Sequence, residues 1–479
     1  MILYIFELSL GEKNTFYMLV NFRVVNFLSL AKLSTLSLVK GSSRQHSNHI
    51  YKNDSINLLK FSAIYGANGA GKSNIIKAIK FSRTIIVENK LSVNYRNSYC
   101  RTNKDNKDIE TSFEYEILIK NKVYSYGFSV FLAKGELKKE WLYEVNGAEE
   151  TALFTVDYDS KDFDINIEYL IDDSNVKARL KTYIDDFKSL KKHDESLFLH
   201  FINDSKTEFP EGSNARVLNN IYSWFNRKLE VITPHRPADH SLVYLDTNDD
   251  AIENFLKDFG TGITKIHKQE ILVEELYKIE DPKFVNFVKD ELSKKVLALA
   301  ENEEKIDDKE LKEKISSFTA MMRTKRNLYS IKIGKENSLQ FNIIKFYHYN
   351  EDESYTLGEE SDGTVRLLEL YDILKNKEDR VFVVDELDRS LHPNLTYNFI
   401  KNYLNTDNKS QLIVSTHEDR ILDLSIMRRD EIWFVEKNDI GESRLYSLEE
   451  FKTRFDKDIM KAYLDGRYGS IPKFRFLNN

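Results

Sequence analysis

Gly66-Ala67-Asn68-Gly69-Ala70-Gly71-Lys72-Ser73 is the stretch that decides the fold. It follows the apolar run Phe61–Tyr65 and precedes Asn74–Ile79, so it fits the pattern G-x-x-x-x-G-K-[ST] between a predicted strand and a predicted helix. Glycines let the backbone turn its N–H groups toward phosphates, and the positive end of the following helix adds to this anion site. The sequence therefore predicts a phosphate-binding loop, in which Lys72 reaches the β- and γ-phosphates and the Ser73 hydroxyl ligates Mg²⁺.

A second candidate site lies far downstream, at the end of Val381–Val384. This apolar, β-branched run is typical of a buried parallel strand, and Asp385 and Glu386 follow it directly. One carboxylate at a strand end can hold the Mg²⁺ that bridges the phosphates, and its neighbour can polarise the attacking water. Taken alone, the pair fits equally well as acids that cap a strand. The phosphate-binding loop favours the functional interpretation.

A third strand is predicted over Gln411–Val414, and it ends in Ser415-Thr416-His417. Polar residues at the carboxyl end of a parallel strand belong in the ligand crevice of an open α/β sheet. His417 can donate a hydrogen bond to a γ-phosphate or orient water there, although a single histidine after a strand is more often a solvated loop residue. We expect three strand ends to converge on one crevice, which favours the functional interpretation.

The order and spacing of these motifs resemble those of an ABC-type ATPase head. In that family a long insertion separates the phosphate loop from the acidic strand, and a short signature containing Ser-x-Gly precedes that strand. Ser361 and Gly363 match the signature, Leu387–Pro393 matches the D-loop, and His417 matches the switch histidine. The signature departs from the Leu-Ser-Gly-Gly-Gln form of membrane transporters, which argues against a transporter subunit. No glutamine is assigned as the Q-loop.

Within this class the chain resembles stand-alone ATPases of bacterial abortive-infection and anti-phage systems, which are relatives of the RecF, SMC and OLD-type heads. The segments that carry the resemblance are Met18–Phe27, Phe255–Ile263, Glu360–Leu368 and Tyr463–Pro472. The resemblance implies an α/β P-loop NTPase of the ABC-ATPase type, with a two-lobed mixed and parallel sheet, a β-subdomain and a helical insertion.

The expected organisation has three parts. Residues 18–164 form the first ATPase lobe with the phosphate loop and a β-hairpin, 165–322 form a helical arm or lid, and 323–479 form the second lobe. The alternating segments 112–119 and 123–130 predict the hairpin. We expect the fold to start at Met18, because residues 1–17 add no pattern that pairs with the family-like strand.

The resemblance also implies Mg²⁺-dependent hydrolysis of ATP by a head that forms a homodimer or higher homo-oligomer through its nucleotide sites. Glu386 and His417 would then be catalytic, and Ser73 and Asp385 would hold the metal. The preference for ATP over GTP rests on the resemblance alone. The residues expected to contact nucleotide are Gly66, Asn68, Gly69, Gly71, Lys72, Ser73, Asn74, Ser361, Gly363 and Asp388.

The family's biology implies a sensor or regulator of anti-phage defence that controls an effector protein from a neighbouring gene. Two alternatives stay open at this point: a DNA-processing ATPase of the RecF kind, and a slow ATPase scaffold that holds a toxic partner. The net charge of −7 does not indicate nucleic-acid binding, but it leaves room for a local basic groove. The basic cluster between Arg323 and Lys335 fits either a solvated strand edge or a contact with phosphate backbones.

Composition sets the remaining limits. The chain has 479 residues, of which 41% are hydrophobic, as in globular proteins with a buried core. No stretch approaches the roughly 18 apolar residues of a membrane helix. The single cysteine, Cys100, excludes an intrachain disulfide and fits a reducing cytosol, so we expect a cytoplasmic protein without a membrane partner.

Overall fold

The structure is a computed structural model whose described residues form two compact units. The larger unit comprises Thr15–Pro234, Asn376–Asp388 and Thr396–Asn479, and the smaller unit comprises Met1–Asn14, His235–Lys375 and Arg389–Leu395. The described residues are 2–6, 16–170, 173–190, 196–204, 206–234, 242, 245, 250–301, 319–333, 338–350, 352–376, 378–451, 459–465 and 467–468.

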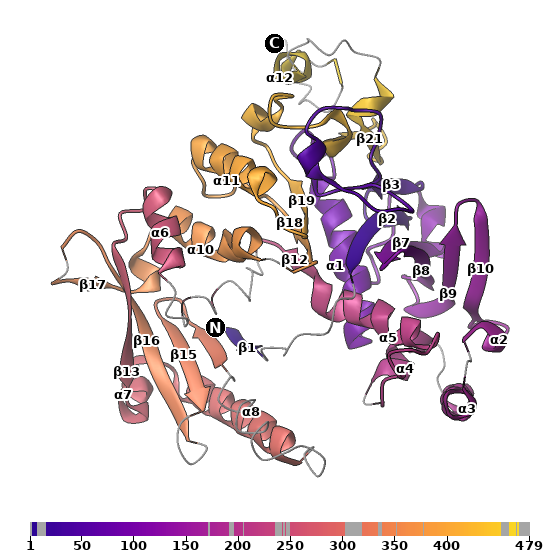
Figure 1. The fold of residues 1–479 in the computed structure, drawn as a ribbon, viewed down its shortest axis with the longest axis horizontal. Helices are drawn as coiled ribbons and strands as arrows, with labels where there is room; N and C mark the ends of the chain where they lie inside the picture. Colours follow the sequence, from indigo (N-terminus) through magenta and orange to yellow (C-terminus); the bar gives the residue numbers. More distant parts are fainter. Residues whose placement is uncertain are drawn as a thin grey trace. The chain divides into compact units, whose positions relative to one another are not determined.

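The central sheet of the larger unit has the strand order β12-β18-β19-β6-β20-β21, and its strands β12, β18, β19 and β21 are labelled in Figure 1. Its first five strands run parallel, and β21 runs antiparallel to β20. Every residue of β6, β18 and β19 is buried, which explains why these strands read as continuous apolar runs. The bounds are β6 Phe61–Tyr65, β12 Leu229–Ile232, β18 Val381–Val384, β19 Gln411–Ser415, β20 Ile432–Lys437 and β21 Ser443–Ser447.

A second sheet of the larger unit is antiparallel, with the order β11-β10-β9-β8-β7-β2-β3. Strands β7 and β8 pair along their length on either side of a short turn, which confirms the predicted hairpin. The bounds are β2 Tyr17–Val25, β3 Ser34–Ser37, β7 Thr111–Ile119, β8 Lys122–Phe131, β9 Glu136–Asn146, β10 Glu149–Asp157 and β11 Asp162–Ile165. A separate two-stranded pair joins β4 (Ile50–Tyr51) to β5 (Leu58–Leu59).

The first five helices of the larger unit share one apolar core with both sheets. Helix α1 contributes Ile75, Ile79 and Phe81, and the aromatic residues Trp224 and Phe225 close the core from the segment that follows α5. The aromatics at three- and four-residue spacing in this region are thus packed inside rather than displayed for base stacking. The bounds are α1 Lys72–Glu88, α2 Ile167–Leu170, α3 Ser174–Ser189, α4 Phe198–Asn203, α5 Arg216–Ser223, α11 Pro393–Asn405 and α12 Ile459–Leu464.

The smaller unit is built on an antiparallel sheet of order β1-β14-β15-β16-β13, with β17 paired to β16. Helix α8 packs Val285, Val288 and Leu292 into the apolar core of this sheet. The strand bounds are β1 Ile2–Phe6, β13 Lys265–Ile271, β14 Thr319–Arg323, β15 Leu328–Ile333, β16 Leu339–Tyr347 and β17 Ser354–Tyr355. The helix bounds are α6 Ala251–Asp258, α7 Val273–Ile279, α8 Pro282–Glu301 and α10 Asp362–Lys375.

The structure divides the chain differently from the predicted boundaries at 164 and 322. The segment 165–234 belongs to the larger unit, because its apolar side chains fill the core beside α1. The next part of the expected helical arm contains β13 and β14, and residues 323–375 continue the same sheet rather than the nucleotide lobe. Strand β13 carries three charged residues in seven, and this charge resembles that of an exposed helix.

The expectation that the fold starts at Met18 is wrong. Ile2–Phe6 form the edge strand β1, which pairs with all five residues of β14, and β2 begins at Tyr17. The two partners are separated by most of the chain, so no local pattern reveals the pairing. Among helices of the described residues, none has both the length and the apolar character needed to cross a bilayer.

Candidate functional site

The loop between β6 and α1 has the backbone shape that the motif predicts. Gly69 has φ +76° and Gly71 has φ +116°, values in the left-handed region that favours glycine. A methyl group on Gly71 would lie 2.4 Å from Oγ of Ser443, so this position also lacks space for a side chain. Asn68 and Gly69 are exposed at the tip of the loop, where they remain accessible to a ligand.

Lys72 begins α1 and is almost fully buried, with 6% of its surface exposed. Its Nζ donates to the carbonyl oxygen of Gly66 at 2.6 Å and lies 3.4 Å from Nδ1 of His417. Burial lowers the pKa of Lys72 to about 8, and the carboxylates of Asp388, Asp385 and Glu386 oppose this shift. A bound phosphate would place negative charge beside the Lys72 ammonium. Anion binding would therefore favour the protonated form of Lys72 and oppose the effect of burial.

Ser73 connects the loop to the acidic strand. Its Oγ donates to Oδ1 of Asp385 at 3.0 Å, and the same carboxylate oxygen accepts a hydrogen bond from Oγ of Ser415 at 2.6 Å. Asp385 is 4% exposed and directly follows the buried strand β18. A hydroxyl and a carboxylate are the hard oxygen ligands that Mg²⁺ prefers, so this pair fits the predicted metal site.

Glu386 and Asp388 follow on the loop after β18. Glu386 has φ +50°, and its backbone N–H donates to Oγ of Ser415 at 2.9 Å. Oδ1 of Asp388 accepts from the backbone N–H of His417 at 3.1 Å. Partial desolvation of the His417 imidazole, together with the positive charge of Lys72, lowers the pKa of His417 and favours its neutral form. The structure therefore brings the three predicted strand ends together.

Two serines that the motif analysis missed support the loop from the side. Oγ of Ser29 accepts hydrogen bonds from Nδ2 of Asn74 and from Oγ of Ser443, each at 2.7 Å. Oγ of Ser443 also lies 2.5 Å from the carbonyl oxygen of Ala70. Ser29 follows β2 and Ser443 begins β21, so single serines from opposite ends of the chain meet here. Neither belongs to a local pattern that sequence reasoning could have found.

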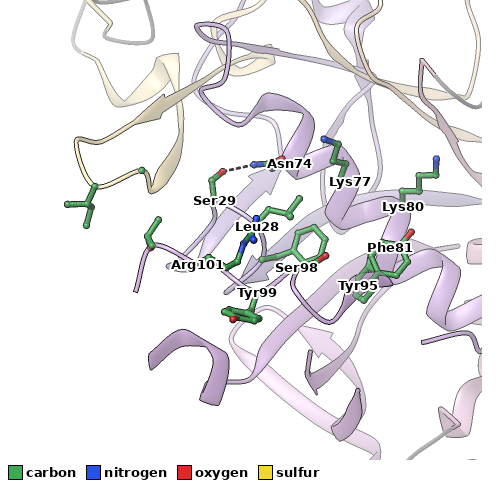
Figure 2. Close-up of a pocket in the computed structure, with 14 residues that line it drawn as sticks. Leu28, Ser29, Asn74, Lys77, Lys80, Phe81, Tyr95, Ser98, Tyr99 and Arg101 are labelled. Carbon is green, nitrogen blue, oxygen red and sulfur yellow. Dashed lines mark hydrogen bonds between the residues drawn. The ribbon is translucent and has the colours of Figure 1, made fainter. Parts of the chain in front are cut away.

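A cavity of about 810 Å³ adjoins these serines, and Figure 2 shows the residues that line it. Ser29 and Asn74 belong to its wall, so the cavity reaches the helix that follows the phosphate-binding loop. Its wall combines positive charge with aromatic surface. The cationic residues are Lys77, Lys80 and Arg101, and the aromatic residues are Phe27, Phe81, Tyr95 and Tyr99. Aromatic faces and cations in one wall suit a ligand with a flat ring and phosphates.

The signature residues lie in the smaller unit. Ser361 precedes α10, and its Oγ accepts from the backbone N–H of Thr364 at 3.1 Å, as an N-cap residue does. Ser361 and Asp362 are exposed. A methyl group on Gly363 would lie 2.9 Å from the carbonyl oxygen of Ser390, so this position has little space for a side chain. The N-terminus of α10 is thus capped by an exposed serine and has a small residue in its first turn.

A comparison with protein families gives one match, to the family described as "AAA domain, putative AbiEii toxin, Type IV TA system". The match covers residues 61–423, which is well over half of the chain. It spans the loop, the acidic strand and His417. A search of the curated proteins finds no match.

Among solved structures, the chain is similar to heads of SMC proteins. An SMC head bound to the C-winged helix domain of ScpA is 15% identical, with a TM-score of 0.41, over 90% of this chain and 97% of the other. The SMC head domain from Thermotoga maritima is 13% identical, with a TM-score of 0.34, over 90% and 98%. An SMC head with an extended coiled coil, bound to the C-terminal domain of ScpA from Pyrococcus furiosus, is 17% identical, with a TM-score of 0.39, over 94% and 100%.

Proposed function

The chain belongs to the family of AAA domains described as putative AbiEii toxins of type IV toxin–antitoxin systems, and on this premise we propose that it binds ATP with Mg²⁺ and hydrolyses it. The observation that carries the proposal is the hydrogen bond of 3.0 Å between Ser73 and Asp385. It joins the end of the phosphate-binding loop to the acidic strand, as a shared metal site requires.

The chain's own groups account for the steps of hydrolysis. The loop amides and the Lys72 ammonium hold the β- and γ-phosphates, which fixes the γ-phosphorus for in-line attack. Ser73 and Asp385 would hold Mg²⁺, which supplies charge neutralisation at the phosphate oxygens. Glu386 accepts hydrogen bonds from the attacking water and polarises it. His417, kept neutral by its surroundings, donates a hydrogen bond toward the γ-phosphate from beside Lys72.

We place the nucleoside in the cavity of about 810 Å³ beside α1. Its wall shares Ser29 and Asn74 with the support of the loop, so the base and ribose would lie next to the phosphates. Tyr99 offers a ring for stacking, and Arg101 offers a positive charge (Figure 2). Tyr99→Ala should weaken binding of a fluorescent ATP analogue, whereas Tyr349→Ala, at a tyrosine of the smaller unit that is 89% exposed, should leave it unchanged.

The exposed signature supports a further part of the proposal, a dimer with ATP at the interface. Ser361 and Asp362 are exposed, and a second subunit would bring Ser361 and the amide of Gly363 to the γ-phosphate. Glu386→Gln should bind ATP but fail to activate water, and it should therefore accumulate the dimer. Lys72→Ala mixed with Ser361→Arg should regain up to one working site per mixed dimer.

A nucleotide titration followed by phosphate release tests the hydrolysis proposal itself. Lys72→Ala should lose affinity by about tenfold or more, since a charged hydrogen bond from a buried site is worth about 1.5–3 kcal/mol. Unchanged affinity and turnover in Lys72→Ala would refute it. If ATP-loaded Glu386→Gln stays as monomeric as the nucleotide-free protein, and mixed variants never complement, the dimer is wrong while hydrolysis can still stand.

For the cellular role, we propose a nucleotide-dependent regulator of an effector in anti-phage defence, supported by the family's description as part of a toxin–antitoxin system. Co-purification of the chain with the product of an adjacent gene, released or tightened by ATP, would support this role. Stimulation of hydrolysis by duplex DNA would favour a DNA-processing ATPase instead. A tightly held partner with almost no turnover would favour a scaffold.

A further inference from the structure

A second, smaller cavity of about 260 Å³ lies in the larger unit. It is lined by Lys40, Ser43, Arg44, Ser47, Ile50, Lys52, Asn57 and Arg428. Half of these side chains are cationic, and among the described residues no carboxylate lines the cavity. None of them belongs to the phosphate-binding loop, the acidic strand or the larger cavity. The hydrolysis mechanism above therefore gives this cavity no role.

Arg428 organises one side of the cavity. Its side chain is fully buried, and Nε and Nη2 donate to the carboxylate of Asp430 at 2.8 and 2.6 Å. Nη2 also donates to the carbonyl oxygen of Ser43 at 2.9 Å, and Nη1 donates to that of Gln45. The guanidinium thus fixes the backbone of the loop that forms the cavity wall, while Asp430 balances its charge.

Three further cations keep an excess of positive charge around the cavity. Within the part of the chain that the structure describes, Lys40, Arg44 and Lys52 have no carboxylate within ion-pair distance. The Nζ of Lys40 donates to the carbonyl oxygen of Gly41 at 3.0 Å. Arg44 and Lys52 are exposed, whereas Lys40 is half-buried. The four cations that line the cavity outnumber the two carboxylates that contact this loop, Asp430 and Glu449, and a bound anion relieves the repulsion among the cations.

Ser43 gives an independent indication of a ligand. Ser43 is 1% exposed and is one of the residues that line the cavity, and its Oγ has no hydrogen-bond partner among the described residues. Buried hydroxyl groups in proteins almost always have a partner, because an unmade hydrogen bond in a buried position is costly. An acceptor oxygen in the cavity would satisfy this hydroxyl.

We propose that this cavity binds one phosphate group, at a site separate from the phosphate-binding loop. The volume lies just below the range of about 300–1,000 Å³ for drug-sized ligands, and so suits a small anionic group. Ammonium, guanidinium and hydroxyl donors surround it, which matches the acceptor-rich, tetrahedral phosphate. Free phosphate and a phosphate at the end or in the backbone of a nucleic-acid strand share this chemistry. The proposal does not depend on ATP hydrolysis.

Isothermal titration with inorganic phosphate tests the site in the full chain, with the loop saturated by Mg²⁺ and a non-hydrolysable ATP analogue. Arg44→Ala/Lys52→Ala should lower phosphate affinity by about tenfold or more, and Ser43→Ala should lower it by about threefold. The matched control is Lys139→Ala/Lys161→Ala, which removes two exposed lysines elsewhere in the larger unit and should leave the affinity unchanged.

A second arm identifies the source of the phosphate. Single-stranded oligonucleotides with and without a 5′-phosphate are titrated into the wild type and the Arg44→Ala/Lys52→Ala variant. Binding that is stronger than that of free phosphate and is lost in the variant assigns a nucleic-acid strand. Binding of free phosphate alone assigns a small solute, and both results support the site. The proposal is overturned if the wild type binds neither probe, or if the variants at Ser43, Arg44 and Lys52 bind phosphate as the wild type does.

Discussion

Replacing Lys72 with methionine should stabilise the nucleotide-free protein at pH 7, although it removes the main charge of the phosphate-binding loop. Burial lowers the pKa of Lys72 from 10.5 to about 8. At about 1.4 kcal/mol per pKa unit, the folded protein gives up at most about 3.5 kcal/mol of stability to keep this ammonium protonated. Methionine retains the length of the buried stem but loses the hydrogen bond to Gly66, so we expect a net gain of about 1–2 kcal/mol.

The pH dependence of the free energy of unfolding shows whether Lys72→Met stabilises the protein by removing a buried charge or by packing better. Below about pH 8 the lysine carries its proton in both the folded and the unfolded state, so the full destabilisation is present. Between about pH 8 and 10.5 the folded wild type releases the proton while the unfolded chain keeps it, and the stability of the wild type rises with pH. The advantage of Lys72→Met should therefore be largest at pH 7 and much smaller at pH 9.5.

Urea unfolding without nucleotide at pH 7 and pH 9.5 measures both quantities. Lys77→Met is the matched control, because Lys77 is an exposed lysine of the same helix and its replacement should change the midpoint little at either pH. The reasoning fails if Lys72→Met is less stable than the wild type at pH 7, or if its advantage is the same at both pH values. With Mg²⁺ and ATP added, the wild type should become more stable than Lys72→Met, since the wild type gains more stability from nucleotide binding than this variant does.

Three further predictions follow from the backbone and the hydrogen bonds. Gly71→Ala should lower the free energy of unfolding by more than Gly69→Ala in urea titrations, because the first methyl group meets a serine hydroxyl at 2.4 Å and the second meets nothing within 4 Å; equal losses would contradict this. Ser415→Ala should raise the Mg²⁺ concentration needed for half-maximal phosphate release by severalfold, as the Asp385 carboxylate loses a buried donor; an unchanged Mg²⁺ dependence would argue against the assigned metal site. Deleting residues 1–6 should lower the melting temperature by several degrees, since β14 loses its edge partner; an unchanged melting curve would show that β1 contributes nothing to the fold.

The chemistry at the strand ends could be predicted because each part is local. The phosphate-binding loop is one continuous segment. The carboxylates and His417 follow apolar runs, so the end of each strand can be predicted from the sequence. The parallel topology then brings these ends to one edge of the sheet, and the contact between Ser73 and Asp385 agrees with that expectation. The catalytic roles of Glu386 and His417 stay predictions.

The supporting contacts could not be predicted, because each depends on the folded arrangement of distant segments. Nothing in the sequence around Ser29 or Ser443 indicates a functional role. Their contact with the loop exists only because the folded sheets bring them together. Arg428 follows no motif, yet it fixes a loop that lies far away in the sequence. The sheet of the smaller unit was also missed, because β1 and β14 contribute five residues each and pair across most of the chain.

The strand order of the central sheet has a consequence for synthesis of the protein. Strand β6 leaves the ribosome early, but its neighbours β19 and β20 begin at Gln411 and Ile432. Until then the nascent chain carries an apolar strand without partners, and such segments promote aggregation or chaperone binding. The pairings are also strongly non-local, which is typical of slow folding. The sheet around β6 therefore closes only after β19 and β20 have been synthesised, and a chain released before Gln411 lacks both neighbours of β6 and the strand that precedes His417.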